Sequence, residues 1–314
     1  MQEAEMTEVV RQKGDSVILK NAMKIRQLLG TKQRNQFAFE ETMGEVESVQ
    51  AEAFMQRYYD SLKQTRLKDN VVVCHSNRGA SRYNQDIRRH IWGDSIPTKS
   101  DGVIPLQVDD VLMVTKNNYN VGLMNGDFTT IVSIGERIQQ SAPVYMKEAG
   151  QLVRKIVTIN FVSVVVEVGE GRLPCMLIED LLDDEKPNLS VDENRALYIN
   201  FCMRYPQLKE NTQDFQDVLL RDPYFNALCA KYGYAVTGHK CQGGEWPHVF
   251  VDYYGKSGMD DDSLRWAYTA TTRAQKTLCV TNLLHITPFS KFRIDPIQKC
   301  KSVDAECRVL GNVG

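Results

Sequence analysis

The strongest constraint on the fold is that strands and helices alternate at both ends of this 314-residue chain but not in its middle. The apolar run Val71–Cys74 is typical of a strand buried in a parallel sheet, and Ser76 or Asn77 is expected to cap the helix that follows. Two further strands, Val249–Asp252 and Leu278–Thr281, flank a helix expected over residues 262–273. This alternation predicts an α/β fold with a doubly wound parallel sheet.

The middle of the chain has a different pattern. Between about residues 106 and 168, short alternating strands are separated by turns, of which Asn125-Gly126-Asp127 is the clearest. We therefore expect a small β-barrel inserted into the α/β domain. The predicted organisation is a first part of the α/β domain over residues 1–104, the barrel over 105–172, the second part over 173–285 and a tail over 286–314.

Composition excludes several classes of protein. The formal net charge of -2 offers no global attraction to nucleic acid, although a groove needs only a local basic strip. The eight cysteines form no CxxC pair and no zinc-ligand spacing, so we expect buried thiols in a reducing compartment and no metal site. The polar N-terminus does not resemble a signal peptide, and the longest apolar run, near residues 161–168, is too short to span a membrane. We therefore expect a cytoplasmic protein without a membrane partner.

The segment from Thr237 to Glu245 has the densest cluster of ligand-binding residue types. Thr237, His239 and Lys240 follow a strand and can direct hydrogen-bond donors at one phosphate or sugar. Gly244 and the glycine before it allow a ligand to approach the backbone closely, and Glu245 suits a sugar hydroxyl. A polar turn with a structural histidine is the alternative, but it does not explain the whole string.

Two arginines are candidates for phosphate binding. Arg273 follows threonines near the end of the helix expected over residues 262–273, where an arginine can reach a triphosphate bound in a neighbouring domain. An arginine that stabilises a helix C-terminus explains this segment equally well. Arg11, within residues 6–12, is a second candidate with less support, because arginines on helices are usually solvated.

Together, these strings resemble superfamily 1 helicases, and most closely the RecD/Dda branch. Residues 237–245 are similar to motif V, residues 268–274 to motif VI and residues 7–12 to motif IV. Residues 73–78 resemble the strand–loop–helix motif that touches single-stranded DNA. Residues 105–127 resemble the Src-homology-3-like barrel that is inserted in this branch.

The resemblance implies a RecA-like doubly wound sheet with an inserted Src-homology-3-like barrel, and it implies roles for particular residues. Arg11 and Arg273 would be the catalytic arginines that contact the γ-phosphate, and Gly244 and Glu245 would lie beside the nucleotide with Arg273. The family also implies ATP and Mg²⁺ in the complete enzyme, single-stranded DNA as the partner and movement from 5′ to 3′. The DNA contacts that it implies are Ser76, Asn77, Arg78, Thr237, His239 and Lys240.

The phosphate-binding loop that such a helicase requires, GxxxxGK[ST], does not occur in the sequence. Gly255-Lys256-Ser257 is a partial match, but the first required glycine falls at Phe250 inside a strand, and two tyrosines would crowd the loop. We therefore expect a RecA-like domain with this loop upstream of Met1. The chain alone is then expected to be inactive and to bind neither ATP nor Mg²⁺ tightly.

Two alternatives remain open at this point. The chain could be a non-enzymatic module that binds nucleic acid or protein on an inherited helicase fold, or a self-contained nucleotide enzyme built on Lys256. The helicase interpretation requires Arg11 and Arg273 to converge on one nucleotide cleft.

Overall fold

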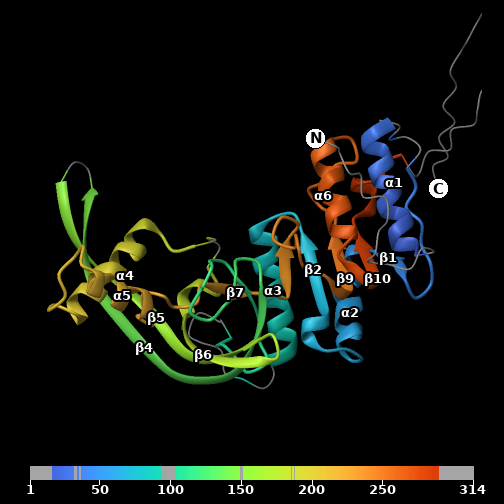
Figure 1. Ribbon diagram of the computed structural model, residues 1–314. Coiled ribbons are helices and arrows are strands. Elements are labelled where there is room, and N and C mark those ends of the chain that lie inside the picture. Colours follow the sequence, from blue (N-terminus) through green and yellow to red (C-terminus); the bar gives the residue numbers. More distant parts are fainter. Residues whose placement is uncertain are drawn as a thin grey trace, which may run out of the picture.

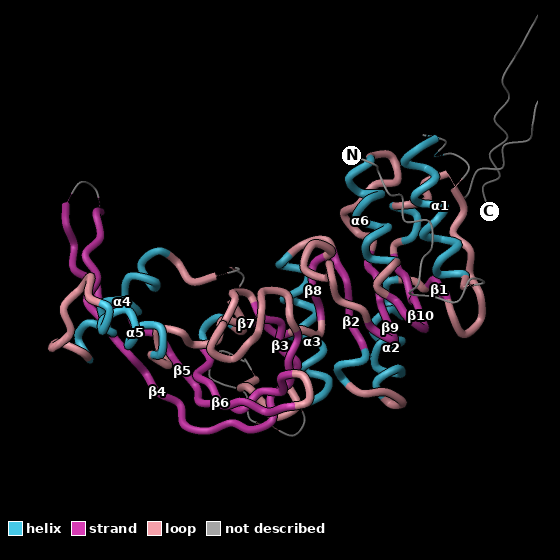
Figure 2. Tube along the Cα trace, in the orientation of Figure 1, coloured by secondary structure: helices cyan, strands magenta, loops and turns pink. Residues whose placement is uncertain are grey.

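The protein has two sheets, one parallel and covered by helices, the other antiparallel with a long hairpin (Figure 1). Figure 2 shows the hairpin strands extending away from the parallel sheet. Across the described residues, no helix combines the length and apolar character needed to cross a membrane. The computed structural model describes residues 16–31, 34, 37–93, 96, 104–148, 151–184, 186 and 188–289.

The parallel sheet has five strands in the order β1-β10-β9-β2-β8. The interior strand β2, which lies between β9 and β8, has every side chain buried, as predicted from its apolar run. The prediction of an α/β fold with a parallel sheet is confirmed. The strand bounds are β1 Val46–Ser48, β2 Asn70–Cys74, β8 Ala235–Thr237, β9 Trp246–Asp252 and β10 Ala274–Thr281.

Helices cover both faces of this sheet. Val71 and Val73 pack into one core with α1 (Val17–Thr31) and α6 (Asp261–Thr271). Val72 and Cys74, whose side chains alternate to the opposite face, pack into a second core with α2 (Ala51–Leu62) and α3 (Asn77–Trp92). This two-sided burial makes the sheet doubly wound.

Polar side chains begin two of these helices. The Ser76 Oγ accepts a hydrogen bond from the Gly79 amide at 3.1 Å, which confirms the predicted cap of α3. Asp260 caps α6 by accepting from the Ser263 amide at 2.7 Å. Residues 1–15, which include the predicted motif IV, lie outside the described residues.

The middle of the chain forms the second sheet, which is antiparallel with the strand order β6-β5-β4-β3-β7. Gly126, at φ 98°, turns the chain between β3 and β4, where the sequence predicted a turn. An isolated parallel bridge joins Leu177 in β6 to Leu228, which precedes β7. The β-rich middle is thus confirmed, while its closure into a barrel remains a prediction. The strand bounds are β3 Val111–Val114, β4 Phe128–Glu148, β5 Gln151–Val168, β6 Gly171–Ile178 and β7 Ala230–Tyr232.

This sheet extends past residue 172, where the sequence placed the end of the insertion. β6 continues to Ile178, and α4 (Val191–Arg204) packs against β4. α5 (Gln213–Arg221) packs on α4, with the rings of Phe201 and Phe215 5.3 Å apart. The reason is that the outer parts of β4 and β5 have an apolar face, which α4 covers. Residues 173–232 therefore pack mainly with the antiparallel sheet.

A buried ion pair fixes α3 to the antiparallel sheet. Arg88 donates from Nε to one oxygen of Asp110 at 3.0 Å and from Nη2 to the other at 2.9 Å. The Tyr234 hydroxyl donates to the same carboxylate at 2.7 Å, and the guanidinium lies 3.8 Å from the centre of the Tyr232 ring. The two sheets are therefore held in a defined relation at this point.

Candidate functional site

The two predicted DNA-binding segments meet at one edge of the parallel sheet. β2 and β8 pair in parallel with Cys74 opposite Thr237, so the loops that follow these strands lie at the same edge. One loop leads through Ser76 into α3, and the other runs over residues 238–245 toward β9. The carboxyl edge of a parallel sheet is where ligands usually bind in such folds.

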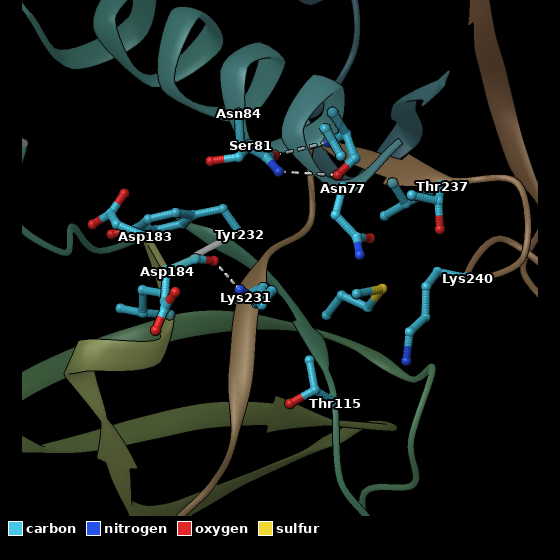
Figure 3. Close-up of a pocket in the computed structure, with 15 residues that line it drawn as sticks. Asn77, Ser81, Asn84, Thr115, Asp183, Asp184, Lys231, Tyr232, Thr237 and Lys240 are labelled. Atoms are coloured by element: carbon cyan, nitrogen blue, oxygen red, sulfur yellow. Dashed lines mark hydrogen bonds between the residues drawn. The ribbon is translucent and has the colours of Figure 1, made fainter. Parts of the chain in front are cut away.

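A pocket lies between this edge and the antiparallel sheet (Figure 3). Asn77, Thr237 and Lys240, three of the predicted DNA contacts, line it. The antiparallel sheet contributes Thr115, which follows β3, and Lys231 in β7. No binding role had been predicted from the sequence for either Thr115 or Lys231.

The other predicted DNA contacts lie outside this pocket. The Ser76 hydroxyl accepts the Gly79 amide, so it already has a structural function in capping α3. Arg78, in the first turn of α3, and His239 are exposed. The structure thus brings the six residues to one edge of the sheet, and their contacts with DNA remain predictions.

The sequence did not predict that Lys256 and His239 both lie near His75. Burial, together with the charges of Lys256 and His239, lowers the pKa of His75 below its usual value. The Lys256 Nζ lies 5.1 Å from the centre of the Trp266 ring, and burial lowers the pKa of this lysine. The sequence suggested only a phosphate loop for Lys256. Its contacts with His75 and Trp266 depend on the tertiary structure and could not be predicted.

The loop over residues 253–258 does not form a phosphate cradle. The amides of Tyr254, Lys256 and Gly258 donate to protein acceptors at 2.9, 3.0 and 2.7 Å, so they are not free for phosphate. The next helix begins with the acidic run Asp260–Asp262, which disfavours an anion at its N-terminus. Both features weigh against a self-contained nucleotide site on Lys256.

Arg273 contacts the far end of the loop over residues 238–245. It stands between α6 and β10 and is 8% exposed. Its Nη1 donates to the Gly244 carbonyl at 3.1 Å, its Nε to the Thr269 carbonyl at 3.0 Å and its Nη2 to the Thr272 Oγ1 at 3.1 Å. The guanidinium is therefore folded against the end of its own helix and this loop, which is the contact expected of an arginine that stabilises a helix C-terminus.

The predicted nucleotide-binding residues Gly244, Glu245 and Arg273 lie close together. The Glu245 carboxylate accepts from the Gln275 Nε2 at 3.1 Å, and a shallow hollow lies between residues 244–246 and the antiparallel sheet. Arg11 lies outside the described residues, so its convergence with Arg273 remains a prediction. In the described part of the chain, no group of three or more His, Cys, Asp or Glu side chains could hold a metal ion.

The segment with this geometry also matches a known family. Residues 232–281, from the end of β7 through β10, match the UvrD-like helicase C-terminal domain. The match is confined to this segment of the chain. The predicted resemblance to a helicase C-terminal domain is thereby confirmed for this segment, whereas the RecD/Dda branch remains a prediction.

Solved helicase structures resemble the chain more distantly. Pif1 helicase from Bacteroides, in complex with ADP-AlF3 and ssDNA, is 10% identical at a TM-score of 0.37, with 89% of this chain and 51% of that chain covered. Pif1 helicase from Candida albicans is 12% identical at a TM-score of 0.33, with 88% and 55% covered. The chain thus spans about half the length of these proteins. No curated protein matches it.

Proposed function

We propose that this chain is the second motor domain of an ATP-dependent DNA helicase or translocase that moves from 5′ to 3′. The observation that carries the proposal is that one loop, residues 238–245, reaches both predicted sites. Near its start, Lys240 lines the pocket with Asn77, and near its end the Gly244 carbonyl accepts a hydrogen bond from Arg273. Such a loop can transmit a change at a nucleotide to a bound strand.

The environment of Arg273 suits an anion. Its three hydrogen-bond acceptors are neutral, and no described carboxylate forms an ion pair with it. A buried charge is normally paired, and the planar guanidinium matches phosphate oxygens. ATP and Mg²⁺, held between this domain and a first motor domain, would supply the triphosphate and neutralise part of its charge. Arg273, Gly244 and Glu245 would hold the nucleotide from this side, with Arg11 as the second proposed arginine.

The first residues of the loop over 238–245, on the side of the proposed DNA site, provide hydrogen-bond donors and positive charge. Asn77, Thr237 and Lys240 line the pocket, and His239 is exposed beside them. Contacts from such groups to phosphates position a strand but carry no base code, so little sequence preference is expected from them. Ser76 and Arg78 complete the proposed grip.

Coupling follows from the hydrogen bond between Arg273 and Gly244. If Arg273 turns toward a phosphate, it releases the Gly244 carbonyl and frees the end of the loop to move. Lys240 lies on the same loop, so its contact with single-stranded DNA changes when the loop moves. Release of the phosphate lets Arg273 return to Gly244.

The strand site is tested by binding of labelled single-stranded DNA to Lys240→Ala, measured by fluorescence anisotropy over a range of salt. We expect weaker binding and a salt slope reduced by about 1, as for loss of one phosphate contact. Lys276→Ala is the matched control, because this exposed lysine borders a separate hollow with His248 and Pro247, near the start of β9. Equal losses in the two variants would contradict the proposed site.

The nucleotide site is tested by Arg273→Ala in a form of the protein that includes a phosphate-binding loop. ATP hydrolysis should fall by about 10³-fold or more while single-strand binding survives. Arg265→Ala is the control, since this arginine lies on the same helix but is 66% exposed and pairs with Asp262. Normal turnover in Arg273→Ala would remove the role assigned to Arg273.

A further inference from the structure

We propose that the pocket between α3, β8 and the antiparallel sheet takes one nucleobase of the bound single strand, and that the Thr115 hydroxyl hydrogen-bonds to that base. This inference rests on the proposed function, because the strand must first lie along Thr237 and Lys240. It adds a base-recognising subsite to a surface that otherwise contacts only the backbone.

Thr115 supplies the observation that points to a ligand. The residue is 5% exposed and lines the pocket, yet its Oγ1 is buried and has no hydrogen-bond partner among the described residues. Its amide donates to the Cys229 carbonyl at 2.9 Å, so the backbone that carries the hydroxyl is fixed. Buried hydroxyls are normally satisfied, and a ligand in this pocket would supply the missing partner once the Thr115 side chain rotates to present its hydroxyl to the pocket.

One wall of the pocket comes from α3 and the other from the antiparallel sheet. Figure 3 shows Thr115 on the side of the antiparallel sheet, with Asn77 and Ser81 on the side of α3. Apolar contact is available from Met113 and Ala80, among others. A flat base needs apolar surface against its faces and polar groups at its edge, and this lining offers both.

The polar lining favours a base that has an amino group. Asp183 and Asp184 line the pocket beside Lys231, whose Nζ donates to the Asp184 carbonyl. Carboxylates accept hydrogen bonds from exocyclic amines, as in recognition of cytosine N4. We therefore expect cytosine to be preferred to thymine.

The position of the pocket favours a strand over a free nucleotide. Lys240 lines it on one loop and Asn77 on another, and the Lys240 Nζ donates to the Asn125 side chain at 3.1 Å. A lysine held in this way can bind the phosphate of the nucleotide whose base enters the pocket. The neighbouring phosphates would then continue along the edge of the sheet toward His239 and Arg78, which are exposed.

The test compares Thr115→Val with wild-type chain for binding to a deoxycytidine octamer and to an abasic octamer with the same phosphates. Wild type should prefer the octamer with bases by about tenfold, and Thr115→Val should reduce that preference by about three- to tenfold. The same substitution should raise the melting temperature, because it removes an unsatisfied buried hydroxyl. A purely structural threonine would not show both effects.

Thr281→Val is the matched control. The Thr281 Oγ1 is also buried without a hydrogen-bond partner in the described part of the chain, but it lies at the end of β10 and does not line the pocket. This variant should also gain stability while keeping the full preference for bases. Loss of preference in Thr281→Val would show that stability alone moves the readout, and it would overturn the inference.

The remaining outcomes separate this inference from the proposed function. Full preference for bases in Thr115→Val overturns the base pocket, while weaker binding by Lys240→Ala would still support the strand site. No binding of either octamer by wild type overturns both. If deoxycytidine monophosphate competes for the pocket as well as the octamer does, the occupant is a free nucleotide, and the proposal that the pocket holds a base of single-stranded DNA is overturned. Equal affinity for thymidine and deoxycytidine octamers overturns the part assigned to the aspartates.

Discussion

Arg88 and Asp110 form a bidentate ion pair in which the two side chains are 3% and 0% exposed. Arg88 lies on α3, whose first turns contribute Asn77 and Ser81 to the pocket, and Asp110 directly precedes β3, which leads to Thr115. The separation of the two pocket walls therefore depends on this ion pair. Such a pair, once buried, is costly to break because the remaining charge is left in a poorly polarisable environment.

Arg88→Met should lower the free energy of unfolding by about 3–5 kcal/mol, because it leaves the Asp110 carboxylate buried without its cation. The double variant Arg88→Met/Asp110→Asn should recover part of this loss, since the asparagine is neutral and can still accept from Tyr234. Arg89→Ala is the control: Arg89 is 66% exposed, and its pair with Asp86 should contribute at most about 1 kcal/mol. Chemical denaturation measures all three, and equal losses in Arg88→Met and Arg89→Ala would contradict the prediction.

Gly238 should tolerate no side chain, because Trp266 fills the space beside it. An added Cβ would lie 2.0 Å from the Trp266 Nε1. Gly238→Ala should therefore displace the indole, lower the free energy of unfolding by about 1–3 kcal/mol and shift the tryptophan fluorescence. Gly243→Ala, in the same loop, has open space around its Cβ and meets only the strain of φ 86°, about 1 kcal/mol. An unchanged emission spectrum in Gly238→Ala would refute the close approach.

The pKa of His75 predicts how stability depends on pH. Burial and the charges of Lys256 and His239 depress this pKa in the folded chain below the ordinary 6.5, so the unfolded chain binds the proton more readily. Protonation of His75 therefore costs the folded chain stability, and this cost is absent above about pH 6.5 and grows as the pH falls below that value. Denaturation between pH 8 and pH 5.5 should show wild type losing more stability in acid than His75→Gln. A constant difference would show that His75 does not titrate in this range.

Bound single-stranded DNA should raise the pKa of His75 again. Phosphate near His75 favours its protonated form, so single-strand affinity should rise as the pH falls from 8 to 6. The rise should be smaller in His75→Gln than in wild type when anisotropy titrations are compared at constant ionic strength. Identical pH profiles would place the strand away from His75.

Local sequence was sufficient to predict the parallel sheet. β2, β9 and β10 each combine an apolar run with a flanking turn or cap, and these signals need no distant partner. The long hairpin was missed for the opposite reason. The outer residues of β4 and β5 alternate in burial only because α4 covers one face, which is a contact between segments far apart in the chain.

The sequence predicted which segments contribute to the site, but not all of the residues that line the pocket. Asn77, Thr237 and Lys240 belong to strings with a recognisable pattern, so they could be assigned before the fold was known. Thr115 and Lys231 lie in or beside ordinary strands, and only the pairing of β3 with β7 brings them to the pocket. A hydroxyl that lacks a partner has no signature in sequence, because its neighbours are set by tertiary structure.

We predict that Lys256 contributes to the proposed DNA-binding surface rather than to a nucleotide-binding loop. Its side chain lies over Trp266 and acts on His75, whereas the amides of its loop are already hydrogen-bonded within the protein. Lys256→Ala should weaken single-strand binding and lower its salt slope by about 1, while Lys276→Ala should leave both unchanged. Equilibrium dialysis with ATP and Mg²⁺ should show no tight binding by either variant or by wild type. Tight ATP binding that Lys256→Ala removes would instead support a nucleotide enzyme built on this loop.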